Sequence, residues 1–135
     1  MRTARQQAGD RAESIVIERL RAAGWIALAR NVRVGRDEID LVAMDPGPQR
    51  CLVIVEVRWR TSRAYGLPEE TIDRRKRERL RRAALRLIGE GRLPSGIRLP
   101  AAPVRLDLIA VEPAGPGSAG TVVLRHYRGA FGDRE

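Results

Sequence analysis

Apolar residues recur at two different spacings along the chain, and each spacing predicts a type of secondary structure. Near the N-terminus they stand three and four residues apart, at Ala8, Ala12, Ile15, Val16, Leu20 and Ala23. This spacing predicts a helix over residues 5–23 with Gly24 as its C-cap. A second stripe of the same period predicts a helix over residues 72–90 with Thr71 as its N-cap. Its apolar members are Ile72, Leu80, Ala83, Ala84, Leu87 and Ile88.

Five further segments are rich in aliphatic residues and too short for long helices. They predict strands over residues 25–30, 38–44, 51–60, 104–112 and 121–127. The turn signal DPGPQ joins the second and third strands, so the first three favour an antiparallel meander. The helix between the third and fourth strands favours a parallel pairing there. The expected fold is α/β, a mixed five-stranded sheet flanked by helices in the order α-β-β-β-α-β-β.

Carboxylates interrupt the apolar pattern of the second and third strands. Glu38 and Asp40 flank Ile39 in one, and Glu56 follows an aliphatic run in the other. Facing side chains of adjacent strands approach within about 5 Å, so Asp40 and Glu56 are expected to repel each other. Buried charge is costly unless it is compensated. A hard divalent cation, Mg²⁺ or Mn²⁺, would remove the repulsion.

Two more groups are candidates for the same cation. Glu13 precedes Val16, Ile17 and Leu20 by three, four and seven residues, which places it at the edge of the apolar face of the first helix. There its carboxylate would complete a cluster with those of the second and third strands. The backbone carbonyl of Val57 would add a neutral ligand.

Arg58 follows Glu56 by two residues and is expected to project on the same side of its strand. There it would contact a scissile phosphate and stabilise charge that develops in the transition state. A metal ion beside a cation is the arrangement that phosphodiester hydrolysis needs. A structural network of salt bridges among Asp40, Glu56 and Arg58 explains the same residues without chemistry. The strongly apolar neighbours of Glu56 argue against an exposed edge strand, where such pairs are common.

Length and charge extend this interpretation. The 135 residues predict one domain spanning 1–135, and the net charge of +9 with a pI of about 11.3 favours a polyanionic partner, with nucleic acid as the default. Only one of the 26 basic residues is a lysine, so the excess of arginine also fits a general bias toward that residue. The second helix carries many cations opposite its apolar stripe. Those expected to grip the phosphate backbone are Arg74, Arg75, Lys76, Arg79 and Arg82.

The remaining composition bears on location. Cys51 is the only cysteine, so no disulfide forms within the chain, and a buried thiol is expected. The N-terminal segment lacks the apolar core of a signal peptide, and no apolar run approaches about 18 residues. We therefore expect a cytoplasmic protein without a membrane partner.

Several blocks of the sequence resemble the YraN-like family of small, largely uncharacterised bacterial proteins. In chain order they are AESIVIERLRAAGWIALARNVRVGRDEIDLVAMD, LVIVEVRWR, YGLPEETIDRRKRERLRRAALRLI, VRLDLIAV and GAF. The resemblance implies a restriction-endonuclease-like fold, similar to that of Holliday-junction resolvases. It also implies the metal site of the nuclease superfamily at Glu13, Asp40 and Glu56. Arg58 stands where that superfamily has a lysine.

The chain departs from the family pattern at three positions. Ala12 and Asp37 stand where the family usually has glycine, and Asp37 adds negative charge beside the site. Arg58 stays protonated, so it can neutralise a phosphate but cannot act as a general base.

The expected function is a metal-dependent endonuclease-like protein that acts on DNA, with branched or structured DNA among the candidate substrates. Glu38 would orient a metal-bound water. The alternatives are a nucleic-acid-binding protein of the same fold that cleaves nothing, and a structural or partner-binding protein whose carboxylates form an ion-pair network. Resemblance to resolvases is compatible with a homodimer.

Overall fold

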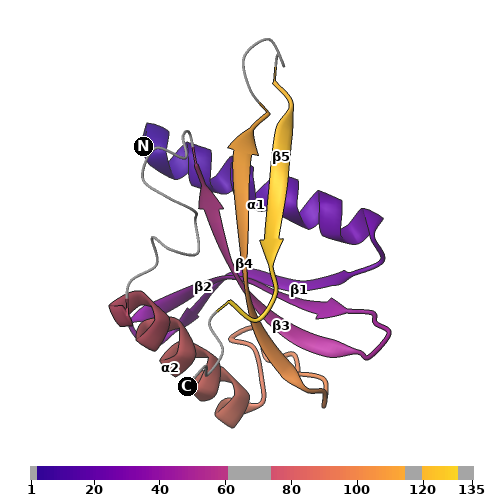
Figure 1. Cartoon of the computed structure of the whole chain (residues 1–135). Coiled ribbons are helices and arrows are strands. Elements are labelled where there is room, and N and C mark those ends of the chain that lie inside the picture. Colours follow the sequence, from indigo (N-terminus) through magenta and orange to yellow (C-terminus); the bar gives the residue numbers. More distant parts are fainter. Residues whose placement is uncertain (1–2, 61–73, 115–119, 131–135) are drawn as a thin grey trace.

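The computed structural model describes residues 3–60, 74–114 and 120–130 (Figure 1). The predicted cap Thr71, the start of the second helix at residue 72 and parts of the YGLPEETIDRRKRERLRRAALRLI and GAF blocks lie outside these ranges. In chain order the described elements are α1 (Ala4–Ala22), β1 (Ile26–Val34), β2 (Asp37–Asp45), β3 (Cys51–Trp59), α2 (Arg74–Glu90), β4 (Val104–Pro113) and β5 (Val122–Tyr127). The predicted element order is confirmed.

The strands form one mixed sheet in the order β1-β2-β3-β4-β5. Strands β1, β2 and β3 are antiparallel neighbours, β3 and β4 are parallel, and β5 returns antiparallel to β4. The predicted meander and the predicted parallel pair are both confirmed. The sheet twists strongly, so that β1 and β2 run almost across the direction of β4 and β5 (Figure 1).

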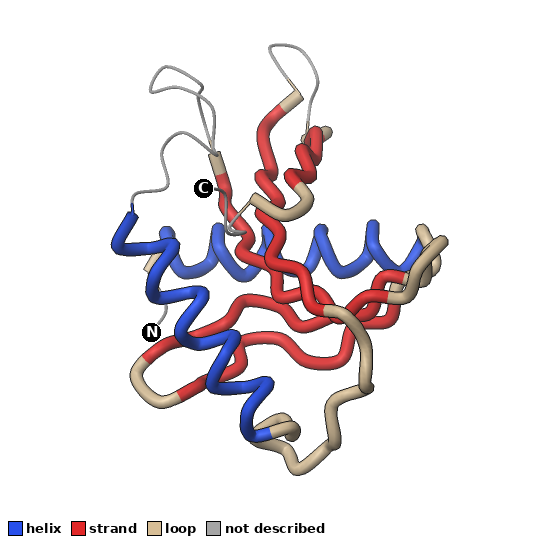
Figure 2. Tube along the Cα trace, turned by 60° about the horizontal axis from the view of Figure 1, so that its bottom comes forward, coloured by secondary structure: helices blue, strands red, loops and turns tan. Residues whose placement is uncertain are grey.

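The two helices cover opposite faces of the sheet and create two separate cores (Figure 2). The buried face of α1, with Val16 and Leu20, packs on Leu41, Val53 and Ile109. The buried stripe of α2 packs on the other face, formed by residues that include Val42, Leu52, Ile54 and Leu108. Because side chains alternate along a strand, even-numbered residues of β3 face α2 and odd-numbered ones face α1.

Helix α1 begins one residue earlier than expected because its first turn is capped. The Thr3 side chain accepts a hydrogen bond from the Gln6 backbone amide, and the Gln6 side chain accepts one from the Thr3 amide. This reciprocal pair satisfies two backbone donors that the helix itself leaves without partners.

Strand β1 is longer than predicted, running to Val34 instead of residue 30. Asn31 adopts a positive φ of 52°, and beyond it Val32 and Val34 turn into the core beneath α2. The prediction stopped at the polar residues Arg30 and Asn31. In the described sheet β1 is an edge strand, where polar side chains are readily tolerated.

Within the described ranges, neither helix is long and apolar enough to cross a membrane.

Candidate functional site

The candidate site lies where β2 and β3 part. Their pairing ends at Leu41 and Val55, so Asp40 and Glu56 are the next facing pair. Both side chains line a cavity that Lys76 and Leu80 of α2 also line. The register therefore brings the two carboxylates together, as the sequence predicts.

The Asp40 carboxylate closes the gap between the strands. Its Oδ2 accepts a hydrogen bond of 2.8 Å from the backbone amide of Val57. This bond takes the place of a backbone hydrogen bond between the paired strands. Burial, followed by the nearby Glu56 carboxylate, raises the pKa of Asp40 to about 8, and Glu13 adds to the rise. In the absence of a cation this raised pKa favours the protonated form of Asp40.

Glu56 is held by an internal cation. The ammonium of Lys76, on α2, lies 2.6 Å from Glu56 Oε2, and only 10% of the Glu56 side chain is exposed. The sequence interpretation placed Lys76 on the outer, cationic face of the helix, and this assignment was wrong. Lys76 precedes the buried Leu80 by one helical turn, so it continues the stripe that faces the sheet.

Glu13 approaches from α1 and is also paired. It is 8% exposed, at the edge of the apolar face as predicted, and its Oε1 lies 3.3 Å from Arg30 Nη2 on β1. Burial raises the pKa of Glu13, while the guanidinium of Arg30 lowers it in part. Glu38 is exposed and lies between the two regions, lining one hollow with Asp40 and another with Glu13.

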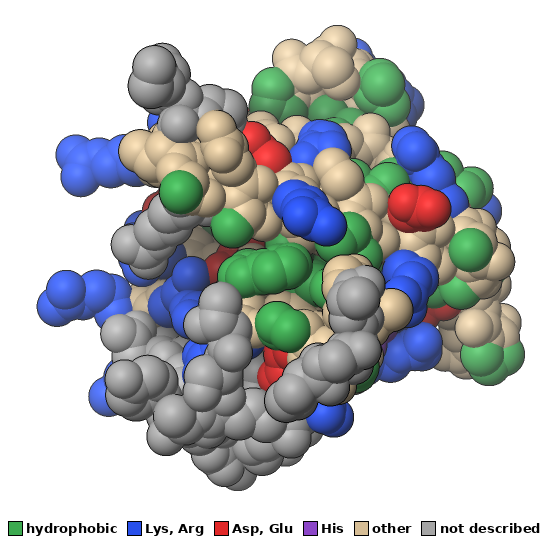
Figure 3. Space-filling model, turned by 90° about the horizontal axis from the view of Figure 1, so that it is seen from above, with side chains coloured by type: hydrophobic (Ala, Val, Ile, Leu, Met, Phe, Trp, Pro, Cys, Tyr) green, Lys and Arg blue, Asp and Glu red, His purple; other side chains and the backbone are tan. Residues whose placement is uncertain are grey.

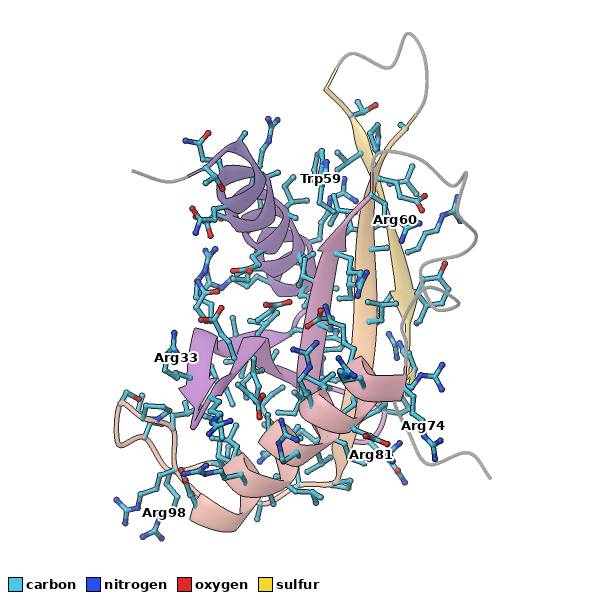
Figure 4. All side chains as sticks on the ribbon, turned by 90° about the vertical axis from the view of Figure 1, so that its left-hand side faces the viewer. Arg33, Trp59, Arg60, Arg74, Arg81 and Arg98 are labelled. Carbon is cyan, nitrogen blue, oxygen red and sulfur yellow. The ribbon has the colours of Figure 1, made fainter. Side chains whose placement is uncertain are left out.

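An open cavity of about 270 Å³ contains both strand carboxylates. Its acidic lining residues are Asp37, Glu38, Asp40 and Glu56. The rest of its described lining is basic apart from Leu80 and comprises Arg36, Lys76 and Arg79. The cavity thus combines oxygen ligands for a cation with positive charges for an anion. Figure 4 views the molecule from the side on which strand side chains occupy the space between α1 and α2.

The donor set fits a hard divalent cation in its chemistry. Asp40 and Glu56 are carboxylates that share a partly buried position, and Glu13 is near enough to affect the pKa of Asp40. The described residues nevertheless include no group of three carboxylate, imidazole or thiol side chains that is close enough to hold a metal ion. Glu56 and Glu13 are drawn toward Lys76 and Arg30 instead. Metal binding by Glu13, Asp40, Glu56 and the Val57 carbonyl therefore stays a prediction.

Arg58 is half-buried, and its Nε is buried without a hydrogen-bond partner in the described part of the chain. It is not among the described residues that line the cavity. Glu56 pairs with Lys76, so the alternative network that joined Glu56 to Arg58 is not the one observed. The contact of Arg58 with phosphate stays a prediction.

The cations of α2 differ in how they are engaged. Arg74 pairs with Glu78 on its own helix, and Arg82 pairs with Asp37 of β2 at 3.2 Å. Arg75 and Arg79 are exposed and form no ion pair with any residue that the structure describes. The exposed Arg33 and Arg74 point away from the sheet (Figure 4). Basic side chains also project around the face seen from above, so positive charge is not confined to α2 (Figure 3).

Sequence reasoning missed two residues of the site, Arg30 and Arg36, and the contact that a third, Lys76, makes with Glu56. Arg30 is the partner of Glu13, Arg36 lines the cavity from the turn after β1, and Lys76 is the partner of Glu56. A signal was present for Lys76, because it lies four residues before Leu80 in the stripe. No local pattern identifies Arg30 or Arg36, since their positions depend on the packing of α1 and α2 against the sheet edge.

Comparison with known proteins identifies the protein family of this chain. The model of the uncharacterised protein family UPF0102 matches residues 12–111. The chain belongs to this family. It is 40% identical over 127 residues to a UPF0102 protein of Symbiobacterium thermophilum, which covers 93% of this chain and 97% of that protein. A UPF0102 protein of Trichlorobacter lovleyi is 37% identical over 106 residues, covering 78% and 77%. One from Sorangium cellulosum is 50% identical over 84 residues, covering 62% and 56%. The YraN-like resemblance is thus confirmed.

Proposed function

We propose that this UPF0102 protein is a metal-dependent endonuclease-like protein that acts on DNA, with branched or structured DNA among its candidate substrates. The observation that carries the proposal is the cavity at the ends of β2 and β3, where Asp40 and Glu56 stand beside Arg36, Lys76 and Arg79. A cavity that holds carboxylates beside cations can bring a metal ion and a phosphate together. The net charge of +9 agrees with a polyanionic substrate.

The order of elements supports a restriction-endonuclease-like fold. A helix precedes an antiparallel meander, and a crossover helix leads to a parallel strand beside β3. The carboxylates stand where the second and third strands of this meander part. The assignment of this fold rests on the order of elements together with the family resemblance.

Each residue of the site has a proposed role. Asp40 and Glu56 would hold Mg²⁺ or Mn²⁺, with Glu13 and the Val57 carbonyl as further ligands. A divalent cation bound there would lower the pKa of a water molecule and offset charge on the phosphate. The Val57 amide already fixes one oxygen of Asp40, and the Asp40 side chain lines the cavity. Glu38 would orient the attacking water.

Cations would position the DNA. Arg58 would contact the scissile phosphate, since its buried Nε lacks a hydrogen-bond partner among described residues. Arg75 and Arg79 would bind phosphates along the duplex from α2, and Arg74 and Arg82 would assist by leaving their carboxylate partners. Such contacts fix the register of a duplex without reading its sequence.

The test is a panel of linear, nicked, flapped and four-way DNA substrates incubated with Mg²⁺ or Mn²⁺. We expect the wild type to cleave at least one of them, and Asp40→Asn and Glu56→Gln to bind it without cleavage. Glu18→Gln is the matched control, because Glu18 is an exposed carboxylate on α1 and its replacement makes the same change of charge. Cleavage that survives in both site variants would overturn the proposal.

A second candidate function is a DNA-binding protein that cleaves nothing. The specific observation in its favour is that Glu13 and Glu56 already have cationic partners in Arg30 and Lys76. Such a protein would bind the same panel with or without divalent ions, and its melting temperature would not respond to Mn²⁺. The purely structural alternative predicts no DNA binding at all.

A further inference from the structure

The only lysine of this chain contacts the candidate metal site. All other basic residues are arginines, yet the cation beside Glu56 is Lys76. The position is also the least exposed of three α2 cations proposed to bind DNA, with 32% of the Lys76 side chain accessible against 62% for Arg82 and 92% for Arg74. A general preference for arginine therefore does not extend to the cation that meets Glu56.

Lysine and arginine differ in how firmly they hold a carboxylate. A guanidinium binds both carboxylate oxygens through a rigid fork, as Arg105 does with Asp107, where the two hydrogen bonds measure 2.8 and 2.9 Å. An ammonium is a compact charge on a flexible stem of four methylene groups. It can rotate away from a carboxylate without breaking a two-bond, forked contact. Lys76 is thus the kind of counter-ion that another cation can displace from Glu56.

The cavity gives the ammonium a second place to go. Lys76 lines it together with Arg36 and Arg79, and both guanidiniums would face a phosphate that entered. A divalent cation at Asp40 and Glu56 would repel the ammonium, while the phosphate would attract it.

We infer that Lys76 is the internal counter-ion of Glu56 in the metal-free protein, and that it leaves Glu56 for the substrate phosphate when a divalent cation binds. The inference rests on the proposed function and adds to it a residue that couples metal entry to phosphate binding. It moves Lys76 from the outer surface that grips the duplex to the reacting centre. Arg58 then need not replace the superfamily lysine alone.

Titration calorimetry of the whole protein with Mn²⁺ alone tests the displacement without any substrate. We expect Lys76→Gln to bind Mn²⁺ at least about tenfold more tightly than the wild type, because the competitor for Glu56 is gone. Lys76→Arg should bind it more weakly, since a forked guanidinium competes better. Arg77→Gln is the matched control: the adjacent position is exposed, and the variant loses the same charge. Its Mn²⁺ affinity should change less than about threefold.

Equal tightening in Lys76→Gln and Arg77→Gln would overturn the inference, because it would reflect only the general electrostatic field. Lys76→Gln also leaves Glu56 buried without its cation. If that variant folds only in the presence of Mn²⁺, the titration of Lys76→Arg alone tests the inference. A Lys76→Arg variant that binds Mn²⁺ as tightly as the wild type, or more tightly, would overturn it.

Cleavage of the DNA panel separates this inference from the proposed function. We expect Lys76→Gln to lose cleavage at least about a hundredfold at saturating Mn²⁺, while Arg77→Gln retains it. If the wild type cleaves and Lys76→Gln cleaves equally well with unchanged Mn²⁺ affinity, the role of Lys76 is refuted and the proposed function stands. If the wild type neither binds Mn²⁺ nor cleaves, the proposed function fails, and the displacement fails with it.

Discussion

Replacing Asp40 with asparagine should stabilise the metal-free protein. The Asn side chain has the same shape, and its oxygen can accept the hydrogen bond that the Val57 amide now donates at 2.8 Å. Its amide group can also donate to Glu56, which a carboxylate cannot do once it is ionised. As the pH approaches 8 and Asp40 ionises in the wild type, the substitution removes a charge from a crowded site, and at every pH it preserves the hydrogen bond that closes the gap between β2 and β3.

The size of the effect follows from the pKa of Asp40, which burial and Glu56 raise from 3.8 to about 8. Well below pH 3.8 the group is protonated in both states and has no effect. Between pH 3.8 and 8 the unfolded chain releases a proton that the folded protein retains, so stability falls as the pH rises. The full slope of about 1.36 kcal/mol per unit gives about 4 kcal/mol between about pH 5 and pH 8. Because Asp40 is only partly buried and water screens its charge, we expect about 2 kcal/mol.

The assay is urea denaturation of wild type and Asp40→Asn in EDTA at about pH 5 and pH 8. The stability advantage of the variant should grow by about 2 kcal/mol between these values, and titrating groups that do not interact with Asp40 cancel in the difference. Mn²⁺ should then raise the melting temperature of the wild type and have little effect on the variant, since a ligand of the native state stabilises it by mass action. A variant that is less stable than the wild type at both pH values and indifferent to Mn²⁺ would refute the reasoning.

Asp107→Asn is a control whose expected effect on stability is opposite in sign to that of Asp40→Asn. Although burial raises the pKa of Asp107, hydrogen bonds from His126, Arg105 and the Gly129 amide lower it to about 2. A depressed pKa gives stability that is present above pH 3.8 and is lost as the pH falls through about 2. Asp107→Asn should therefore destabilise the protein by about 2 kcal/mol at pH 8, where Asp40→Asn is expected to stabilise it.

The remaining predictions concern phosphate contacts. Arg75→Gln combined with Arg79→Gln should weaken DNA binding similarly for every sequence. It should also flatten the slope of log binding constant against log salt concentration by about 0.9 for each phosphate that is no longer neutralised. An unchanged slope in a salt titration would mean that these residues are merely solvated. Arg58→Ala should leave Mn²⁺ binding intact in calorimetry and abolish cleavage. Arg58→Lys should retain cleavage, and a lysine variant as inactive as the alanine variant would contradict the phosphate contact.

The fold was largely predictable because local patterns and sheet topology agree. The stripe ending at Leu20 and the DPGPQ turn define α1 and the β2–β3 hairpin, and the crossover through α2 favours the parallel pairing of β3 and β4 that the sheet shows. The extent of β1 was not predictable in the same way. Its last residues alternate around Arg33, and a positive φ at Asn31 resets which side chains face the core.

The site was only partly predictable, for a related reason. Register alone brings Asp40 and Glu56 together, because it is a property of two adjacent strands. The positions of their counter-ions depend on how a helix packs on the sheet. In a segment rich in arginine, the sequence does not distinguish the cation that faces inward from those that face solvent. The periodicity of α2 assigns Lys76 to the inner stripe, but seven neighbouring arginines make a uniform outer face the simpler interpretation.

Charge balance links the ion pairs to the proposed metal site. In the metal-free protein one proton compensates Asp40 and one ammonium compensates Glu56, which together supply two positive charges. A divalent cation supplies the same two charges to the same two carboxylates when Lys76 leaves and Asp40 releases its proton to solvent, so its entry need not change the net charge of the pair. The carboxylates of Asp45 and Asp107 offer no such exchange, because the forked guanidinium of Arg105 already bridges them and holds both in place. A raised pKa beside a displaceable lysine thus distinguishes the carboxylates proposed to bind a cation from those that support the fold.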